Sequence, residues 1–501
     1  MNRARNKPMM VARFAGVTLL AHADGEHDRI ASARRGRSPT TRCLGLSIQV
    51  SFLCFAFTVA PPAHAVPPVV AMERISVDSA GGEANGSSFS SAISADGRYI
   101  AFDSGATNLA SMASSRSASE MAAPAGFPTD VYVRDRRLGV TEWISVAAGG
   151  QHANAACNNP TISADGRYVA FTSVADNLVD GDTNGFFDVF VRDRTLSTTV
   201  RASVAGDGPD VDGGGYGNGD YTMPAWMSAN GRYVVFVSTK KLTANAVTST
   251  FHLYRRDLVA GITELVSVNP GGMSANNVSA GGALSIDGRY VMFQSGASDI
   301  VPGLPSYTQV TLFVRDMLLG ITTSLTPNLS TPDLCWVSSG DNKSYNLSGN
   351  GRFAVFNSYC QDIAPGQTAQ DRLFMRDLAT ATTSVLRLAQ GGSEDPQGGA
   401  YLSAVNSGRY VVAWTAAALI PGDTNDLTDV FLRDRAAANT FRVSQRMDGA
   451  SADQASYAPS ISAAGHIVFA SDATNLIDAD SNARRDIFVA TLDPLFAGGF
   501  E

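Results

Sequence analysis

The stretch with the clearest capacity for chemistry is DGDTNGFFD, at residues 180–188. Its oxygen-bearing side chains alternate along the chain at Asp180, Asp182, Asn184 and Asp188. Gly185 stands among them, where a sharp turn is needed. Alternating oxygen ligands around a glycine turn are how the first half of a calcium loop wraps a hard cation. The spacing therefore predicts that these four residues bind Ca²⁺.

A structural explanation of the same stretch competes with calcium. The acidic residue that closes a calcium loop is missing, because Val191 occupies its position. Asp and Asn side chains also hydrogen-bond the backbone of their own turns. Two partial copies, PGDTNDLTD at 421–429 and DADSNARRD at 478–486, stand in the same context. The sequence thus leaves a cation site and a plain turn both open.

Other catalytic signatures are lacking. Beyond residue 65 the histidines are His152, His252 and His466, which are far apart in the chain. The sequence contains no G-x-S-x-G, no H-E-x-x-H and no phosphate-binding glycine loop. A site assembled from loop carboxylates would leave no linear motif, so these observations disfavour an enzyme without excluding one.

The first 65 residues differ from the rest of the chain. They carry nine Lys/Arg and three Asp/Glu, the apolar run LGLSIQVSFLCFAFTVA at 44–60, and PPAHA ending at Ala65. A basic region, a short apolar run and an Ala-x-Ala close describe a secretory signal peptide rather than a membrane span. We therefore predict that residues 1–65 are a leader and that the protein is exported, to the periplasm or the medium.

Charge narrows the possible partners. Without the leader the formal charge falls from −8 to −14, since the leader contributes +9 and −3. An acidic chain without basic clusters is a poor ligand for nucleic acid. No later segment approaches the ~20 apolar residues that a membrane span needs. We expect no nucleic acid, no membrane span and a monomer.

One phrase recurs seven times along the chain. SADGRYIAF at 94–102 returns with its glycine at positions 97, 166, 231, 288, 351, 408 and 465. A second phrase follows each copy, beginning with DVYVRD at 130–135, and a shorter segment such as TEWISV at 141–146 follows the first six. Asp-Gly beside alternating β-branched and aromatic residues is the strongest short hairpin signal. Each unit therefore predicts four antiparallel strands.

Seven four-stranded units without helical periodicity predict an all-β, seven-bladed β-propeller. The seventh unit stops at DIFVATLD without a fourth strand, whereas ERISV at 73–77 precedes the first unit and matches TEWISV. We therefore expect the N-terminal strand to complete the last blade. The predicted propeller covers residues 66–493, and residues 494–501 form a tail.

The S-x-D-G-R-Y-x-A-F phrase, followed by D-V-F-V-x-D, resembles the blade repeat of TolB-like propellers, which are relatives of the WD-repeat propellers. The resemblance spans nearly all of residues 70–493 and is weakest where Gly465-His466 replaces Asp-Gly-Arg. It implies the fold but not the role of TolB, because no room for the preceding TolB domain is expected between Ala65 and Glu73.

Strand direction should place the Asp-Gly turns on one face of the ring and the irregular connections on the other. The irregular set includes residues 107–129, 205–221 and 324–336. Loops on a rigid scaffold often carry binding residues, although insertions also drift where they do no harm. Cys335 and Cys360 fall on the same face, and an exported chain can join them in a disulfide.

These features favour an exported, non-enzymatic propeller that binds an envelope or extracellular protein or glycan through its irregular loops. Two alternatives stay open. One is a hydrolase or lyase that acts on an extracellular polymer or small ester through loop carboxylates. The other is a purely structural component of the cell envelope.

Overall fold

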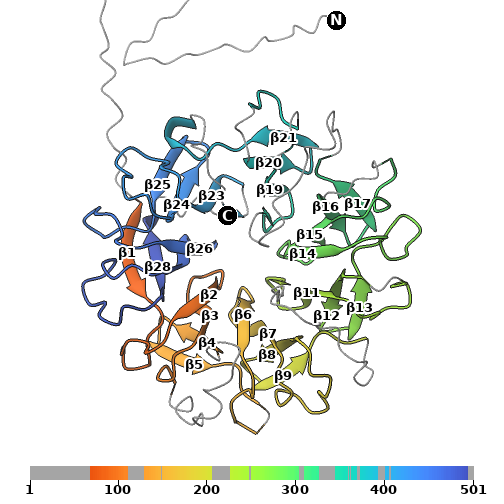
Figure 1. Cartoon of the computed structure of the whole chain (residues 1–501), viewed down its shortest axis with the longest axis horizontal. Coiled ribbons are helices and arrows are strands. Elements are labelled where there is room, and N and C mark those ends of the chain that lie inside the picture. The colour runs from red at the N-terminus through yellow and green to blue at the C-terminus, as the bar shows by residue number, and fades with distance from the viewer. Residues whose placement is uncertain are drawn as a thin grey trace, which may run out of the picture. The chain divides into compact units, whose positions relative to one another are not determined.

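The computed structural model folds the chain into seven four-stranded antiparallel sheets, which stand as blades around a ring (Figure 1). The described residues are 68–494 apart from 111–128, 148, 206–225, 248–249, 304–309, 327–344, 359, 361–362, 369–372, 393–400 and 405–407. The predicted all-β, seven-bladed propeller is thereby confirmed.

Six blades consist of four consecutive strands, and the first strand of each blade is the innermost. Blade 1 contains β2 (Ser88–Ile93), β3 (Tyr99–Ser104), β4 (Asp130–Asp135) and β5 (Val140–Trp143). Blade 2 contains β6 (Cys157–Ile162), β7 (Tyr168–Ser173), β8 (Asp188–Asp193) and β9 (Thr198–Arg201). Blade 3 contains β10 (Trp226–Met227), β11 (Tyr233–Ser238), β12 (His252–Asp257) and β13 (Ile262–Leu265).

The next three blades repeat this order. Blade 4 contains β14 (Ser279–Leu284), β15 (Tyr290–Ser295), β16 (Thr311–Asp316) and β17 (Ile321–Ser324). Blade 5 contains β18 (Tyr345–Leu347), β19 (Phe353–Asn357), β20 (Leu373–Asp377) and β21 (Thr382–Val385). Blade 6 contains β22 (Tyr401–Ala404), β23 (Tyr410–Thr415), β24 (Asp429–Asp434) and β25 (Asn439–Arg442), and a short 3₁₀ helix, η3 (Gln390–Gly392), precedes it.

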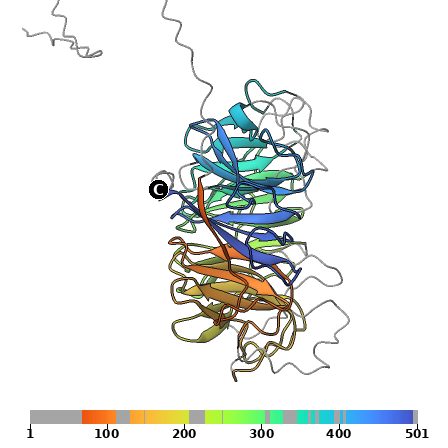
Figure 2. The ribbon, with the colours of Figure 1, turned by 90° about the vertical axis from the view of Figure 1, so that its left-hand side faces the viewer.

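Blade 7 is completed by the first strand of the propeller. It contains β26 (Ser456–Ile461), β27 (His466–Ser471), β28 (Asp486–Leu492) and β1 (Val69–Arg74). Figure 2 shows β1 beside the blue strands of this blade, and its register places Val69 opposite Leu492. The amide of Asp493 also donates to the carbonyl oxygen of Pro68 at 2.6 Å. The expected N-terminal closure is confirmed, with the strand at 69–74 rather than at 73–77.

Apolar packing between blades forms the core. In six blades an aromatic pair stacks across the second and third strands, with ring centroids between 5.6 and 6.1 Å apart. These pairs are Phe102–Tyr132, Phe171–Phe190, Phe236–Tyr254, Phe293–Phe313, Phe356–Phe374 and Phe469–Phe488. Because the same position recurs in each blade, the alternating pattern of the repeat builds the core directly.

The Asp-Gly turn explains why its phrase recurs. In blade 1 the Asp96 carboxylate accepts a hydrogen bond from Ser94 Oγ at 2.6 Å, and Gly97 adopts a φ of +73°. Tyr99 then packs on the next blade, so closely that a Cβ on Gly166 would lie 2.2 Å from Tyr99 Cδ2. The phrase is therefore both a tight turn and a contact between blades.

The arginine of the phrase closes an ion pair within its own blade. Its guanidinium meets the aspartate that ends the third strand, at 2.6 to 2.7 Å, in six blades. The pairs are Arg98–Asp135, Arg167–Asp193, Arg232–Asp257, Arg289–Asp316, Arg352–Asp377 and Arg409–Asp434. Their recurrence in blade after blade fits a structural role rather than catalysis.

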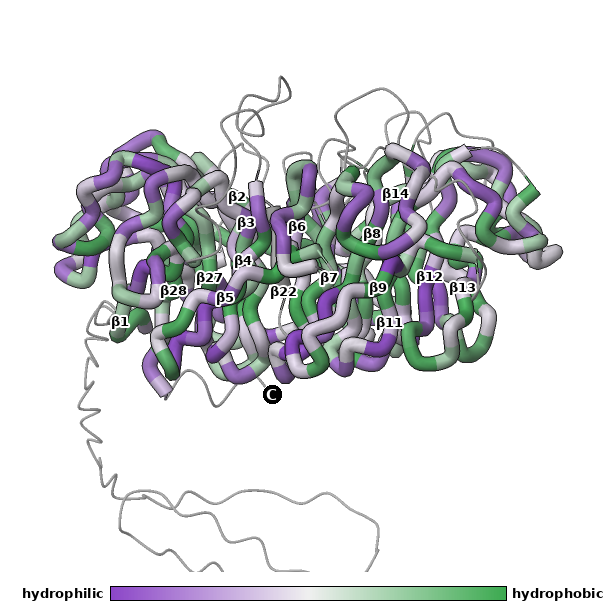
Figure 3. The backbone as a smooth tube through the Cα atoms, turned by 90° about the horizontal axis from the view of Figure 1, so that it is seen from below, coloured by the Kyte–Doolittle hydropathy of each residue, from purple (hydrophilic) through white to green (hydrophobic). Residues whose placement is uncertain are grey.

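Strand direction sorts the connections onto two faces. The Asp-Gly face carries the turns between the first and second and between the third and fourth strands, which span only four residues (136–139) or five (94–98). The loop face carries all other connections, from 13 residues (75–87) to 25 (105–129). Figure 3 shows the ring edge-on, with hydrophobic residues frequent in the strand layer between these faces. In the described residues no helix is long and apolar enough to cross a membrane.

Candidate functional site

Three acidic loops on the loop face contain the candidate cation site and its two partial copies. Each connects the second and third strands of its blade: residues 180–188 in blade 2, 421–429 in blade 6 and 478–486 in blade 7. In all three, the last aspartate is the first residue of the third strand and is fully or almost fully buried. A carboxylate in that position needs a partner.

In blade 2 the partner is an arginine that the spacing did not indicate. Arg201 Nη1 lies 2.9 Å from Asp182 Oδ1 and 3.4 Å from Asp188 Oδ2. Asn184 Nδ2 donates to Asp188 Oδ2 at 2.7 Å, so three of the four predicted ligands converge. The fourth, Asp180, is exposed at the start of the loop.

The other two loops have the same arrangement. In blade 6, Arg442 Nη1 lies 3.3 Å from Asp423 and 3.6 Å from Asp429. In blade 7, Arg74 Nη1 lies 3.2 Å from Asp480 and 3.6 Å from Asp486. A guanidinium therefore lies where the alternating carboxylates of each loop meet, and supplies positive charge there.

The arginine and the acidic loop occur together within the chain. Arg201, Arg442 and Arg74 are the last residues of β9, β25 and β1, the fourth strands of blades 2, 6 and 7. The same position in the other blades holds Trp143, Leu265, Ser324 and Val385. Comparing fourth strands across repeats was thus the signal that could have revealed the arginine from sequence. Calcium binding by Asp180, Asp182, Asn184 and Asp188 stays a prediction.

Burial dominates the electrostatics of these loops. It raises the pKa of Asp486 to about 6, against the opposing charge of Arg74. Burial likewise raises the pKa of Asp423, Asp429 and Asp480. In the described parts of the chain, no three His, Cys, Asp or Glu side chains are grouped so that they could hold a metal ion.

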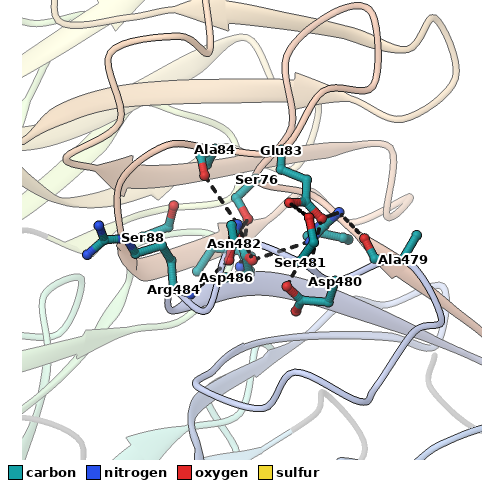
Figure 4. A network of polar contacts seen from close by, with 12 residues as sticks. Ser76, Glu83, Ala84, Ser88, Ala479, Asp480, Ser481, Asn482, Arg484 and Asp486 are labelled. Atoms are coloured by element: carbon teal, nitrogen blue, oxygen red, sulfur yellow. Dashed lines mark hydrogen bonds and ion pairs between the residues drawn. The ribbon is translucent and has the colours of Figure 1, made fainter.

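In blade 7 the acidic loop also joins the two ends of the propeller (Figure 4). Glu83 accepts hydrogen bonds from Ser481 Oγ at 2.7 Å and from Arg74 Nη2 at 2.6 Å. Ser76 Oγ donates to Asp486 Oδ1 at 2.5 Å. The acidic loop thus reinforces the closure that β1 and β28 make through their backbones.

The cysteines and histidines lie apart from these loops. Cys360 is fully buried and disulfide-bonded, whereas its predicted partner, Cys335, is outside the described residues. The Cys335–Cys360 bridge therefore stays a prediction, and Cys157 is a buried thiol. His152 stacks on Trp143 at a centroid distance of 4.0 Å.

The irregular connections that were predicted to bind a partner are described only in part. Of residues 107–129, the described ones are 107–110 and 129, and of 205–221 only Ala205. Of residues 324–336, only 324–326 are described.

Comparison with known proteins bears on the fold. No protein-family model and no curated protein matches the sequence. Among solved structures, TolB from Acinetobacter baumannii is similar over 59% of this chain and 53% of its own, with 17% identity and a TM-score of 0.33. This chain thus matches about half the length of that TolB. The resemblance to TolB-like propellers holds for the fold.

Other propellers match over a larger share of their length. An oligogalacturonate lyase from Vibrio parahaemolyticus covers 85% of this chain and 98% of its own, with 13% identity and a TM-score of 0.48. The β-propeller domain of the Trilobed protease from Pyrococcus furiosus covers 81% and 95%, with 9% identity and a TM-score of 0.48. At such identities the similarity concerns architecture.

The Asp-Gly face has an exposed feature of its own. The turns between the third and fourth strands of blades 1 to 4 carry aliphatic side chains that are 62 to 77% exposed: Leu138, Leu196, Val259, Leu318 and Leu319. A cavity of about 330 Å³ lies beside the last of these turns, lined in part by Leu319, Ile321 and Leu378. This face therefore offers a second surface against which any binding claim for the loop face must be tested.

Proposed function

We propose that the protein is an exported, non-enzymatic propeller whose loop face binds an envelope or extracellular protein or glycan. The observation that carries this proposal is the asymmetry of the ring. Turns of four or five residues repeat on the Asp-Gly face, whereas connections of 13 to 25 residues differ from blade to blade on the loop face. A rigid ring with one varied face suits recognition.

The acidic loops support binding over catalysis. An acid or base in hydrolysis or elimination must be able to exchange a proton with its substrate. Asp182 and Asp423 instead lie against Arg201 and Arg442, and the last aspartate of each loop is buried. A hydrolase or lyase would need other carboxylates, so that activity is the alternative against which the proposal is tested.

Export rests on the leader predicted in residues 1–65. N-terminal sequencing of the protein recovered from periplasm and medium would test it. We expect a mature chain that begins close to residue 66. A chain recovered only inside the cell with its leader intact would contradict export.

Affinity capture from envelope extracts tests the binding face. The full chain is compared with variants that lack residues 107–129 or 205–221, and with a matched control in which Leu138, Leu196 and Val259 are changed to Ser. We expect capture to fall at least tenfold in a loop variant that still melts cooperatively, and to survive in the control. Capture that depends on the three aliphatic residues would assign binding to the Asp-Gly face instead.

A further inference from the structure

A group of aromatic and charged side chains lies where blade 7 meets blade 1. The guanidinium carbon of Arg485 is 4.7 Å from the ring centroid of Tyr457 and 5.8 Å from that of Phe89. Phe89 belongs to β2 and Tyr457 to β26, the innermost strands of the two blades. Arg485 immediately precedes β28. The chain therefore places an arginine against two aromatic rings from neighbouring blades.

The arginine is held by its own ion pair. Arg485 Nε and Nη2 each lie 2.8 Å from a different oxygen of Asp472, which follows β27. Burial and the Asp472 charge raise the pKa of the Tyr457 hydroxyl. Trp414 meets Tyr457 edge-on, with ring centroids 5.5 Å apart. The pair of charges is thus fixed in a two-point geometry beside aromatic surface.

The group remains open to solvent. Phe89 is 40% exposed, and the side chains of Arg485 and Asp472 are 32% and 34% exposed. β2 and β26 begin on the loop face, and the residue before β28 lies at the same end. These side chains therefore lie on the proposed binding face, close to the inner edge of the ring.

The repeat shows that a blade junction does not require this group. The amide of Ser88 donates to the carbonyl of Arg485, and in the same way the amide of Cys157 donates to Thr129 at the junction of blades 1 and 2. The backbones correspond, but there the position of Arg485 holds Thr129 and that of Phe89 holds Asn158. Since a neighbouring junction forms without the aromatic and charged set, that set is a departure from the structural repeat.

We propose that Phe89, Tyr457, Arg485 and Asp472 form a platform that binds a neutral glycan. The idea rests on the proposed function and names its ligand class. A sugar ring has an apolar C–H face that can stack on the exposed Phe89 ring. Its rim of hydroxyls can donate to Asp472 and accept from Arg485, which together supply both hydrogen-bonding roles.

Charge and area favour a neutral glycan over a charged ligand or a protein. Asp472 balances Arg485, so the platform carries no net charge with which to select an acidic sugar or a basic peptide. A protein interface usually needs a continuous patch with a buried apolar centre. On this platform one partly exposed ring adjoins an ion pair, which matches the alternation of C–H and O–H groups on a sugar.

The test uses an array of uncharged oligosaccharides, with calorimetric titration of any that bind to the full chain. Phe89→Ala should weaken the affinity for the bound glycan at least tenfold, and Phe89→Tyr should retain it. Phe186→Ala is the matched control, because Phe186 is 37% exposed on the loop face of blade 2. It should leave affinity unchanged, and all variants should melt within about 3 °C of wild type.

Two outcomes would overturn the inference: no uncharged glycan binds the wild-type chain, or Phe89→Ala and Phe186→Ala weaken binding equally. The broader proposal is judged separately by loop-dependent capture. A partner that requires the loops but ignores Phe89→Ala would leave the loop face as the binding face and remove the glycan platform. Capture that ignores both the loops and Phe89 would remove both.

Discussion

The two faces of the ring solve the same problem in opposite ways. On the Asp-Gly face every aspartate of the six ion pairs is held by a partly exposed arginine, which lowers the pKa of the carboxyl, as at Asp135 and Asp193. On the loop face the aspartates of the acidic loops are buried with their arginines, and burial raises the pKa of Asp486 and Asp429. Geometry repeats on the first face, whereas the second departs from the repeat.

This contrast indicates where sequence change is tolerated. A turn that packs on its neighbour in each blade leaves little freedom, because any change disturbs a contact between blades. A long connection ends in the same strands but makes fewer obligatory contacts, so its side chains are available for recognition. Four measurements would test the contrast between the faces.

The largest effect is expected on the Asp-Gly face. A Cβ on Gly231 would lie 2.2 Å from Tyr168 Cδ2, in a residue whose φ is +69°. Gly231→Ala should lower the free energy of unfolding by about 4 kcal/mol, from overpacking and backbone strain together. Gly181→Ala is the matched control on the loop face, where φ is +78° and no atom lies within 4 Å. It should cost about 1 kcal/mol in chemical denaturation, and equal losses would erase the contrast between faces.

Removing a buried arginine should have the next largest effect. Arg74→Met leaves Asp480 and Asp486 without their cation, and we expect a loss of about 3 kcal/mol. Adding Asp480→Asn and Asp486→Asn should restore much of that loss, since the uncompensated charges are then gone. If the triple variant is no more stable than Arg74→Met, packing rather than charge explains the effect.

The pH dependence of stability should differ between the faces. Asp486 has a folded pKa of about 6, above its unfolded value, so its contribution is present at low pH and is lost as pH rises through 6. Between pH 7.5 and 5.5 the wild type should therefore gain about 1 kcal/mol relative to Asp486→Asn. Asp135 has a lowered folded pKa, so its contribution is lost only as pH falls below about 4. Parallel stability curves for wild type and Asp486→Asn would contradict this assignment.

Calcium should produce the smallest change. Because Arg201 already compensates Asp182 and Asp188, we expect calcium and a chelator to move the melting temperature of the wild type by less than about 1 °C. Arg201→Gln removes that compensating charge and should make melting respond more to calcium. A rise of several degrees in the wild type would instead support the predicted metal site.

The sequence predicted the fold well because the repeat contains its own turn chemistry. The Asp-Gly turns, the alternating second strands and the missing fourth strand of the last unit were sufficient for blade number and closure. The candidate site was predicted only in part. Asp182, Asn184 and Asp188 do converge, but Arg201 is a strand away from them, and the Arg74–Asp480 pair joins residues about 400 positions apart. Phe89 and Arg485 likewise meet only because the ring closes, which no local spacing can indicate.

The position of β1 has a consequence for how the molecule is made. Val69–Arg74 is the first strand of the propeller to be synthesised, whereas its partner, Asp486–Leu492, is the last. Every shorter nascent chain therefore has one strand edge without its partner and a ring that cannot yet close. An unpaired edge invites association with other chains. The final residues of the propeller thus act as a completeness check: a chain cut short before β28 keeps its first strand exposed.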